Sequence, residues 1–233
     1  PRQPVEKVEI KYPDKPVAII GAGPCGLTAA QDLIREGYPV TVFEASAVPG
    51  GMLRLGIPEY RLPRDVLQAQ IREILDLGPE LRLNAPLGRD FSLADLRHQG
   101  FKAILLALGL HRSRDLPISG HDLDGVVKGI DFLLNVNLGY RFSIGKRVVV
   151  IGGGNVAIDV ARTALRQQQR LTLEALSSSL LPDSLTPSEL EVAMKELMDV
   201  SRAALRLGAR EVHLVCLESR EEMPAFEDEI EEG

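Results

Sequence analysis

Short apolar runs alternate with helical patterns along this chain, and the alternation predicts an α/β fold. The first run, Val17–Ile20, is rich in β-branched residues, as the strands of buried parallel sheets are. Glycines follow it, then a helical pattern over Leu27–Glu36 and a second apolar run at Val40–Phe43. A strand, a glycine turn, a helix and a second strand in this order are typical of a βαβ unit.

The pattern continues with elements of the same kinds. Glycine and proline are frequent at 45–63, which predicts an irregular loop. Beyond it we expect a helix at Arg64–Leu77 and two short strands at Leu81–Leu83 and Ala103–Leu108. A connecting region follows, in which we expect an apolar helix at Ile130–Val136.

The strand, turn and helix recur in the second half of the chain. Arg147–Ile151 predicts a strand, Gly152–Gly154 a turn and Val156–Leu165 a helix. The next apolar strand, Glu211–Leu217, comes late for a second βαβ unit.

An internal repeat explains the delay. Residues 159–166 and 199–206 share six of eight amino acids at an offset of 40, which indicates a helical insertion at 167–206. The second helix of the insertion would begin at Thr186, a favourable N-cap residue. Its apolar stripe either packs on the parent domain or forms a subunit contact.

Three glycines directly after the first strand form a G-x-G-x-x-G motif, at Gly21, Gly23 and Gly26. They allow a tight turn, close approach of a pyrophosphate to the backbone and close packing of helix on strand, while the helix that Pro24 opens attracts phosphates at its N-terminus. Glu44 ends the second strand 18 residues after Gly26, where an acid accepts ribose hydroxyls. The pattern favours a dinucleotide site over a purely structural turn.

The second turn repeats the motif as G-x-G-x-x-A, with Gly152, Gly154, Asn155 and Ala157. The matching acid is Glu218, which lies 61 residues after Ala157, or 21 without the insertion. We therefore predict two Rossmann-like dinucleotide-binding domains, the second with the helical insertion. Such a pair points to a flavin enzyme that also binds a nicotinamide cofactor.

Composition narrows the classes of function. Of 233 residues, 45% are hydrophobic and 26% charged, which is ordinary for a globular protein. Aromatic residues make up 4%, Trp is absent and no basic stripe is visible, so the composition does not favour a nucleic-acid-binding protein. Two cysteines are too few for an iron–sulfur cluster or a disulfide framework. No transmembrane segment or secretory signal is visible, and we expect a reduced, cytoplasmic setting.

The net charge of −6 comes from the C-terminal segment. Residues 217–233 hold eight acidic residues and one Arg, so the rest of the chain carries about +1. This acidic run is either a solvated helix face or a docking tail. The four histidines show no metal-ligand spacing, and no metal site is predicted; they are His98, His111, His121 and His213.

The glycine-rich loop GGMLRLGIPEYRLP at 50–63 either lets a flat ring pass close to the backbone or is only structural. With it, the run from Val17 to Val66 closely resembles the small, flavin-bearing subunit of glutamate synthase. Relatives of that subunit include the flavin module of dihydropyrimidine dehydrogenase and the larger subunit of electron-bifurcating NADH-dependent ferredoxin:NADP oxidoreductase. The segments IGGGNVAIDVARTALR at 151–166 and SREEMPAFEDEIEE at 219–232 resemble the pyridine-nucleotide domain of the same family.

The resemblance implies an FAD-dependent NAD(P)H oxidoreductase module. Hydride would pass between NAD(P)H and FAD, and single electrons would go on to iron–sulfur centres of a partner. The implied domains are a lead-in arm at 1–15, the N-terminal part of an FAD-binding domain at 16–145 and an incomplete NAD(P)-binding domain at 146–233. The implied FAD contacts are Gly21, Gly23, Pro24, Gly26, Glu44, Gly51, Met52, Leu53, Arg54, Arg61, Leu87 and Gly109. The implied NAD(P) contacts are Gly152, Gly154, Asn155, Ala157, Glu218 and Arg220.

The chain departs from this family in three respects. The relatives are much longer and include a later G-D segment, so we expect the remainder of the flavoprotein fold in the same or another chain. Iron–sulfur clusters would lie on that missing segment or on an iron–sulfur or ferredoxin-type partner. Cys25 stands where relatives usually have Ala and is interpreted as a small core residue rather than a redox thiol. Leu108 replaces the Thr of an A-T-G segment that ends at Gly109.

The choice of coenzyme depends on charge. NADPH-preferring relatives have an Arg-Arg pair where this chain has Leu217 and Glu218. A carboxylate accepts a hydrogen bond from a free 2′-hydroxyl and repels a 2′-phosphate, which favours NADH. Arg220 could still bind the phosphate, so NADPH stays open. Asp159 either orients the nicotinamide end or stabilises its helix.

Two other classes of function remain. A non-catalytic structural or adaptor subunit would keep the fold without a functional flavin. A nucleotide sensor would bind its cofactor without turnover, and flavin reduction by NAD(P)H separates both from the enzyme.

Overall fold

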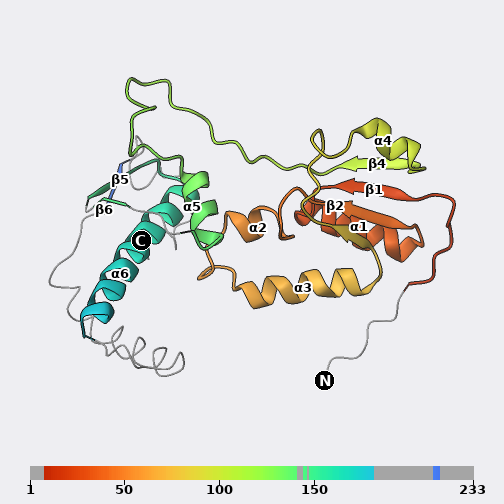
Figure 1. Cartoon of the computed structure of the whole chain (residues 1–233), viewed down its shortest axis with the longest axis horizontal. Helices are drawn as coiled ribbons and strands as arrows, with labels where there is room; N and C mark the ends of the chain where they lie inside the picture. Colours follow the sequence, from red (N-terminus) through yellow and green to blue (C-terminus); the bar gives the residue numbers. More distant parts are fainter. Residues whose placement is uncertain (1–7, 141–143, 146, 181–211, 216–233) are drawn as a thin grey trace. The chain divides into compact units, whose positions relative to one another are not determined.

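The computed structural model describes residues 8–140, 144–145, 147–180 and 212–215 (Figure 1). By internal packing the chain divides between Arg114 and Asp115 into two compact units.

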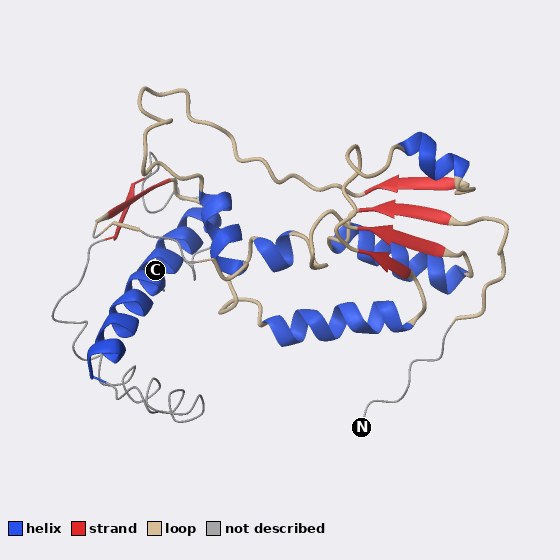
Figure 2. Cartoon of the chain, viewed as in Figure 1, coloured by secondary structure: helices blue, strands red, loops and turns tan. Residues whose placement is uncertain are grey.

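The first unit is built on a four-stranded parallel sheet with the order β3-β2-β1-β4 (Figure 2). Its strands are β1 (Val17–Ile20), β2 (Val40–Phe43), β3 (Glu80–Arg82) and β4 (Ala103–Leu106), and its helices are α1 (Pro24–Glu36), α2 (Met52–Leu55), α3 (Arg64–Asp76) and α4 (Leu93–His98). In the register of β1, Val17 lies opposite Val40 of β2 and Ala103 of β4. The two central strands are therefore paired on both edges, and every residue of both is buried.

Alternate residues of β1 build two separate cores, as the period of a strand requires. Val17 and Ile19 face one core, and buried side chains of α1 and α3 cover it. Ala18 and Ile20 face the other core, which Leu96 of α4 closes. The sheet thus lies between two helical layers, and the turn after β1 emerges at the carboxyl edge of the sheet, where ligands of such folds bind.

The second unit contains a parallel pair of strands and two helices among its described residues. They are β5 (Val148–Ile151), β6 (Val212–Val215), α5 (Gly129–Asn137) and α6 (Asn155–Leu180). Helix α5 packs within this unit, since its Phe132 and Leu133 are buried against Ala164 of α6. The boundary at 145, drawn above between two functional domains, stays a prediction.

The predicted elements are found with shifted ends. Helix α1 begins at Pro24 instead of Leu27, and β4 ends at Leu106 instead of Leu108. Helix α6 runs unbroken to Leu180, past the end predicted at Leu165 and into the predicted insertion. The rest of the insertion, from 181 on, lies outside the described residues. Helices α2 and α4 were not predicted.

Candidate functional site: the glycine turn after β1

Two glycines of the first turn are required by the fold itself. Gly21 has φ +111°, and a Cβ built on it would lie 2.3 Å from the carbonyl oxygen of Ala107. A Cβ on Gly26 would lie 1.9 Å from the oxygen of Gly21, inside van der Waals contact. The amide of Gly21 donates to the carbonyl of Phe43 at 2.7 Å, which joins the turn to the end of β2.

Gly23, in contrast, is not required by the fold. Its φ of −78° and ψ of −176° are extended backbone that any residue adopts. A Cβ built on it would meet only the Cα of Gly51, at an ordinary contact distance of 3.7 Å. The absence of a side chain at this position therefore leaves open space beside the backbone, as a bound diphosphate needs.

Gly23 is also the N-cap of α1, and no side chain caps this helix end. The first turn of the helix contains no acidic residue, and Pro24 occupies its first position. Its N–H groups and the positive end of the helix dipole suit an anion.

Glu44 is held against this turn by three donors. The amide of Ala22 donates to Oε2 of Glu44 at 2.7 Å. The amide and the hydroxyl of Ser46 donate to Oε1 at 2.9 and 2.7 Å. A carboxylate has about four lone-pair sites, so this one is oriented and still able to accept from a ribose hydroxyl.

The loop at 50–63 begins directly beside the turn. The amide of Gly50 donates to the carbonyl of Ala22 at 2.8 Å, and a Cβ on Gly51 would lie 2.7 Å from the Cα of Gly23. Gly51 has φ +53°, which favours glycine, and is the N-cap of α2. The structure therefore brings Gly51 to the glycine turn, with Met52, Leu53 and Arg54 following in a four-residue helix.

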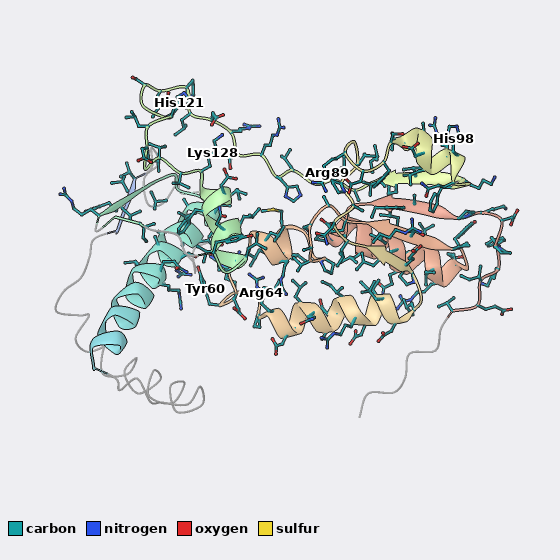
Figure 3. The ribbon with its side chains drawn as sticks, viewed as in Figure 1. Tyr60, Arg64, Arg89, His98, His121 and Lys128 are labelled. Atoms are coloured by element: carbon teal, nitrogen blue, oxygen red, sulfur yellow. The ribbon has the colours of Figure 1, made fainter. Side chains whose placement is uncertain are left out.

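Arg64 was missed by the sequence analysis. It is the first residue of α3, and its guanidinium donates to the carbonyls of Leu53 at 3.1 Å and Ile57 at 2.8 Å (Figure 3). Partial burial lowers the pKa of Arg64, and the positive charge of Arg54 lowers it further. A basic residue in the first turn of a helix, opposed to the helix dipole, was the signal that could have found it.

The other residues predicted to contact FAD lie around this turn to different extents. The amide of Ala85 donates to the carbonyl of Glu44 at 2.9 Å, which brings the segment leading to Leu87 beside the acid. Gly109, with φ +67°, follows Ala107, whose carbonyl lies against Gly21. Arg61 is half-buried, and its amide donates to the carbonyl of Pro58 within the loop.

The turn after β5 repeats the first turn with one difference. The amide of Gly152 donates to the carbonyl of Val215 at 2.8 Å, as Gly21 does to Phe43, and Gly152 has φ +133°. The carbonyl of Gly154 accepts from the amide of Ala157 at 2.9 Å at the start of α6. Here Ala157 stands where the first turn has Gly26. A Cβ built on Gly152 would lie 3.4 Å from the Cβ of Ala157.

At this second turn α6 begins at Asn155, and Asp159 is buried one turn further on. Glu218 and Arg220 lie outside the described residues. The two acids differ in their position along the chain. Glu44 directly follows Phe43, whose carbonyl accepts the hydrogen bond from Gly21, whereas Glu218 lies three residues after Val215, whose carbonyl accepts the corresponding bond from Gly152.

The interpretation of Cys25 as a core residue is wrong. Cys25 is exposed in the first turn of α1, and the buried positions of this helix are Gly26, Leu27, Ala30 and Ile34. Leu108, which replaces the hydroxyl-bearing residue of the A-T-G segment, is exposed too. Among the described residues, no group of three His, Cys, Asp or Glu side chains is placed to hold a metal ion.

Comparison with known proteins identifies the family. Residues 15–232 match the family described as pyridine nucleotide-disulphide oxidoreductase. The chain belongs to this family. Its members are oxidoreductases that bind FAD and NAD(P)H, which confirms the predicted enzyme class and its cofactors at the level of the family.

Two relatives place the chain more closely. It is 41% identical over 222 residues to the NADP(+)-dependent formate dehydrogenase subunit beta of Moorella thermoacetica, covering 94% of this chain and 26% of that protein. It is 38% identical over 169 residues to the glutamate synthase [NADPH] small chain of Halomonas elongata, covering 68% of this chain and 36% of that protein. The second match confirms the resemblance stated above, and this chain spans only about a quarter to a third of either relative.

A solved structure confirms the fold class. A mutant of FprA from Mycobacterium tuberculosis superposes with a TM-score of 0.68 at 25% identity, covering 94% of this chain and 47% of FprA. An α/β fold with two Rossmann-like dinucleotide-binding domains is thus established. Within the described part of the chain, none of the helices is long and apolar enough to cross a membrane.

Proposed function

We propose that this chain is the FAD-binding and NAD(P)H-binding module of an oxidoreductase complex. FAD would bind at the turn after β1, and the pyridine nucleotide at the turn after β5. The single observation that carries the proposal is Gly23: the fold has room for a side chain there, so its absence is explained by a ligand that needs the space.

The residues around Gly23 support a dinucleotide rather than a lone phosphate. The uncapped N-terminus of α1 suits the diphosphate, and the oriented carboxylate of Glu44 suits the adenosine ribose on the same edge of the sheet. FAD supplies both groups. The proposed contacts in this unit are Gly21, Gly23, Pro24, Gly26, Glu44, Gly51, Met52, Leu53, Arg54, Arg61, Leu87 and Gly109.

No acid, base or nucleophile of the chain is required by the reaction. The chemistry that FAD supplies when bound is acceptance of a hydride from the reduced pyridine nucleotide, followed by release of single electrons. The chain holds the diphosphate, fixes the adenosine end and excludes water around the ring, which is catalysis by positioning. The loop that begins at Gly51 provides the backbone for the ring, and Arg54 adds positive charge to it.

NADH is the coenzyme that Glu218 favours, because a carboxylate at the ribose repels a 2′-phosphate. Arg220 and the NADP(+) dependence named for the Moorella relative both argue for NADPH. The proposed contacts of the pyridine nucleotide are Gly152, Gly154, Asn155, Ala157, Glu218 and Arg220.

The onward electron acceptor would be an iron–sulfur or ferredoxin-type redox subunit. The names of the relatives support the proposal of a partner subunit, since one is the beta subunit of a formate dehydrogenase and the other is the small chain of a glutamate synthase. The remainder of the flavoprotein fold would come from the same or another chain. A reducing, cytoplasmic setting fits a chain with only two cysteines.

The test is to purify the complex that contains this chain, denature it and quantify the flavin released. We expect about one FAD for each chain, and loss of the visible flavin absorbance when NADH or NADPH is added without oxygen. A colourless complex that cannot be reconstituted with FAD would favour the structural or adaptor subunit. FAD that stays oxidised in the presence of both coenzymes would favour the sensor.

A further inference from the structure

Arg64 joins α3 to the loop at 50–63 by hydrogen bonds, in addition to the apolar contact that Leu53 makes with the core cluster containing Leu67 and Ile71 of α3. Its side chain leaves the first turn of α3 and reaches the carbonyls of Leu53 in α2 and Ile57 after it, at 3.1 and 2.8 Å. One planar guanidinium therefore holds two successive parts of the loop, a geometry that a lysine cannot reproduce.

The position is electrostatically unfavourable. A positive charge in the first turn of a helix opposes the helix dipole. Partial burial and then the neighbouring cation Arg54 lower the pKa of Arg64, while the carboxylate of Glu59 raises it. Charge stabilisation of α3 therefore does not account for this arginine, and its two hydrogen bonds to the loop do.

The segment held by Arg64 contains little regular structure of its own. Helix α2 has four residues, too few for a helix to be stable by itself. At its N-terminal end the segment is fixed by the bond from Gly50 to Ala22 and by contact of Gly51 with Gly23. Toward its C-terminal end the two hydrogen bonds from Arg64 join the segment to the start of α3.

We propose that Arg64 is a positioning residue for FAD, which fixes the backbone of residues 51–58 against the glycine turn without itself touching the cofactor. The inference rests on the proposed function, because it assigns the flavin ring to this segment. Loss of the guanidinium removes the hydrogen bonds that Arg64 donates to the carbonyls of Leu53 and Ile57, so the segment opens more often and binds FAD more weakly.

The experiment compares Arg64→Met and Arg64→Lys in the full chain with a matched control, Arg72→Met, an exposed arginine on the same helix. Hydrogen exchange of residues 53–58 is measured by mass spectrometry without cofactor. Exchange in β1 and β2 serves as the internal reference for global stability. The dissociation constant of FAD is measured for each protein by quenching of flavin fluorescence.

We expect Arg64→Met to speed exchange in 53–58 and to raise the dissociation constant of FAD, each about tenfold. Arg64→Lys reaches one carbonyl and falls between the wild type and Arg64→Met, while Arg72→Met matches the wild type. The inference is overturned if both quantities stay within twofold in Arg64→Met, or if Arg64→Lys restores the wild-type values. It is also overturned if exchange rises equally in β1 and β2. A wild-type chain that binds no FAD contradicts the proposed function, while the exchange data still decide whether Arg64 holds the segment.

Discussion

The backbone amide of Ala22 donates a 2.7 Å hydrogen bond to Oε2 of Glu44, across 22 positions of the chain. This bond joins the glycine turn after β1 to the acid at the end of β2. The diphosphate region and the ribose region of the proposed FAD site are therefore fixed relative to each other before any ligand binds, which lowers the entropy lost on binding.

Gly23→Ala and Gly26→Ala separate ligand binding from folding. A methyl group at Gly23 has room in the protein but fills the space proposed for the diphosphate, so the melting temperature stays nearly unchanged and the dissociation constant of FAD rises at least tenfold. A methyl group at Gly26 would lie 1.9 Å from the oxygen of Gly21, and we expect a destabilisation of about 3 kcal/mol. Calorimetry and FAD titration measure the two effects, and unchanged FAD binding by Gly23→Ala would contradict the proposed site.

The exposed thiol of Cys25 reports on occupancy of the same turn. It lies in the first turn of α1, two residues after Gly23, so FAD bound there would block reagents. In a Cys216→Ser background, we expect saturating FAD to slow alkylation of Cys25 about tenfold. Mass spectrometry of the labelled peptide measures the rate, and equal rates with and without FAD would place the cofactor elsewhere.

Asp95 makes the stability of α4 depend on pH. The hydroxyl of Ser92, and then its backbone amide, donate to Asp95 and lower the pKa of this carboxyl. A lowered pKa in the folded state adds stability above the unfolded value, about 3.9, and that stability is lost as the pH falls through the folded pKa.

The difference in melting temperature between the wild type and Asp95→Asn should therefore be largest near neutral pH. It should shrink as the pH falls below about 4. A difference that does not change between these conditions would show that the charge on Asp95 has no role in the cap.

Glu218 is predicted to select the coenzyme. Glu218→Gln removes the charge that repels a 2′-phosphate, so the ratio of kcat/KM for NADPH to that for NADH should rise about tenfold. Steady-state kinetics of the complex measures the ratio, with Glu232→Gln in the same acidic run as the control. An equal change in both variants would mean that only the overall negative charge matters.

Local patterns were enough to predict much of the fold. The apolar run Val17–Ile20, the glycines after it and the break at Gly37 all act within a few residues of their own positions. Helix α4 was missed although Ser92 and Asp95 have the spacing of a capping box, which the structure contains. The four residues of α2 were missed because glycine and proline surround them and no periodicity can develop in so short a segment.

The site was predicted less completely, for physical reasons. The glycine turn and Glu44 belong to one βαβ unit, which sets the spacing between them, so both could be predicted from the sequence. The bonds of Arg64 go to backbone carbonyls of Leu53 and Ile57, and every residue has a carbonyl, so no side-chain pattern marks such partners. The error at Cys25 was avoidable, because position 25 lies off the stripe formed by Leu27, Ala30 and Ile34.

The most direct test of the account is to titrate the protein with FAD and with FMN, which lacks the adenosine. Wild type, Glu44→Gln and the exposed control Glu36→Gln are compared by quenching of flavin fluorescence. Since Glu44 is assigned to the adenosine ribose, Glu44→Gln should raise the dissociation constant of FAD at least tenfold and leave that of FMN unchanged. Glu36→Gln should change neither. Wild-type affinity for FAD in Glu44→Gln would contradict the central claim that the turn after β1 and Glu44 together bind a dinucleotide.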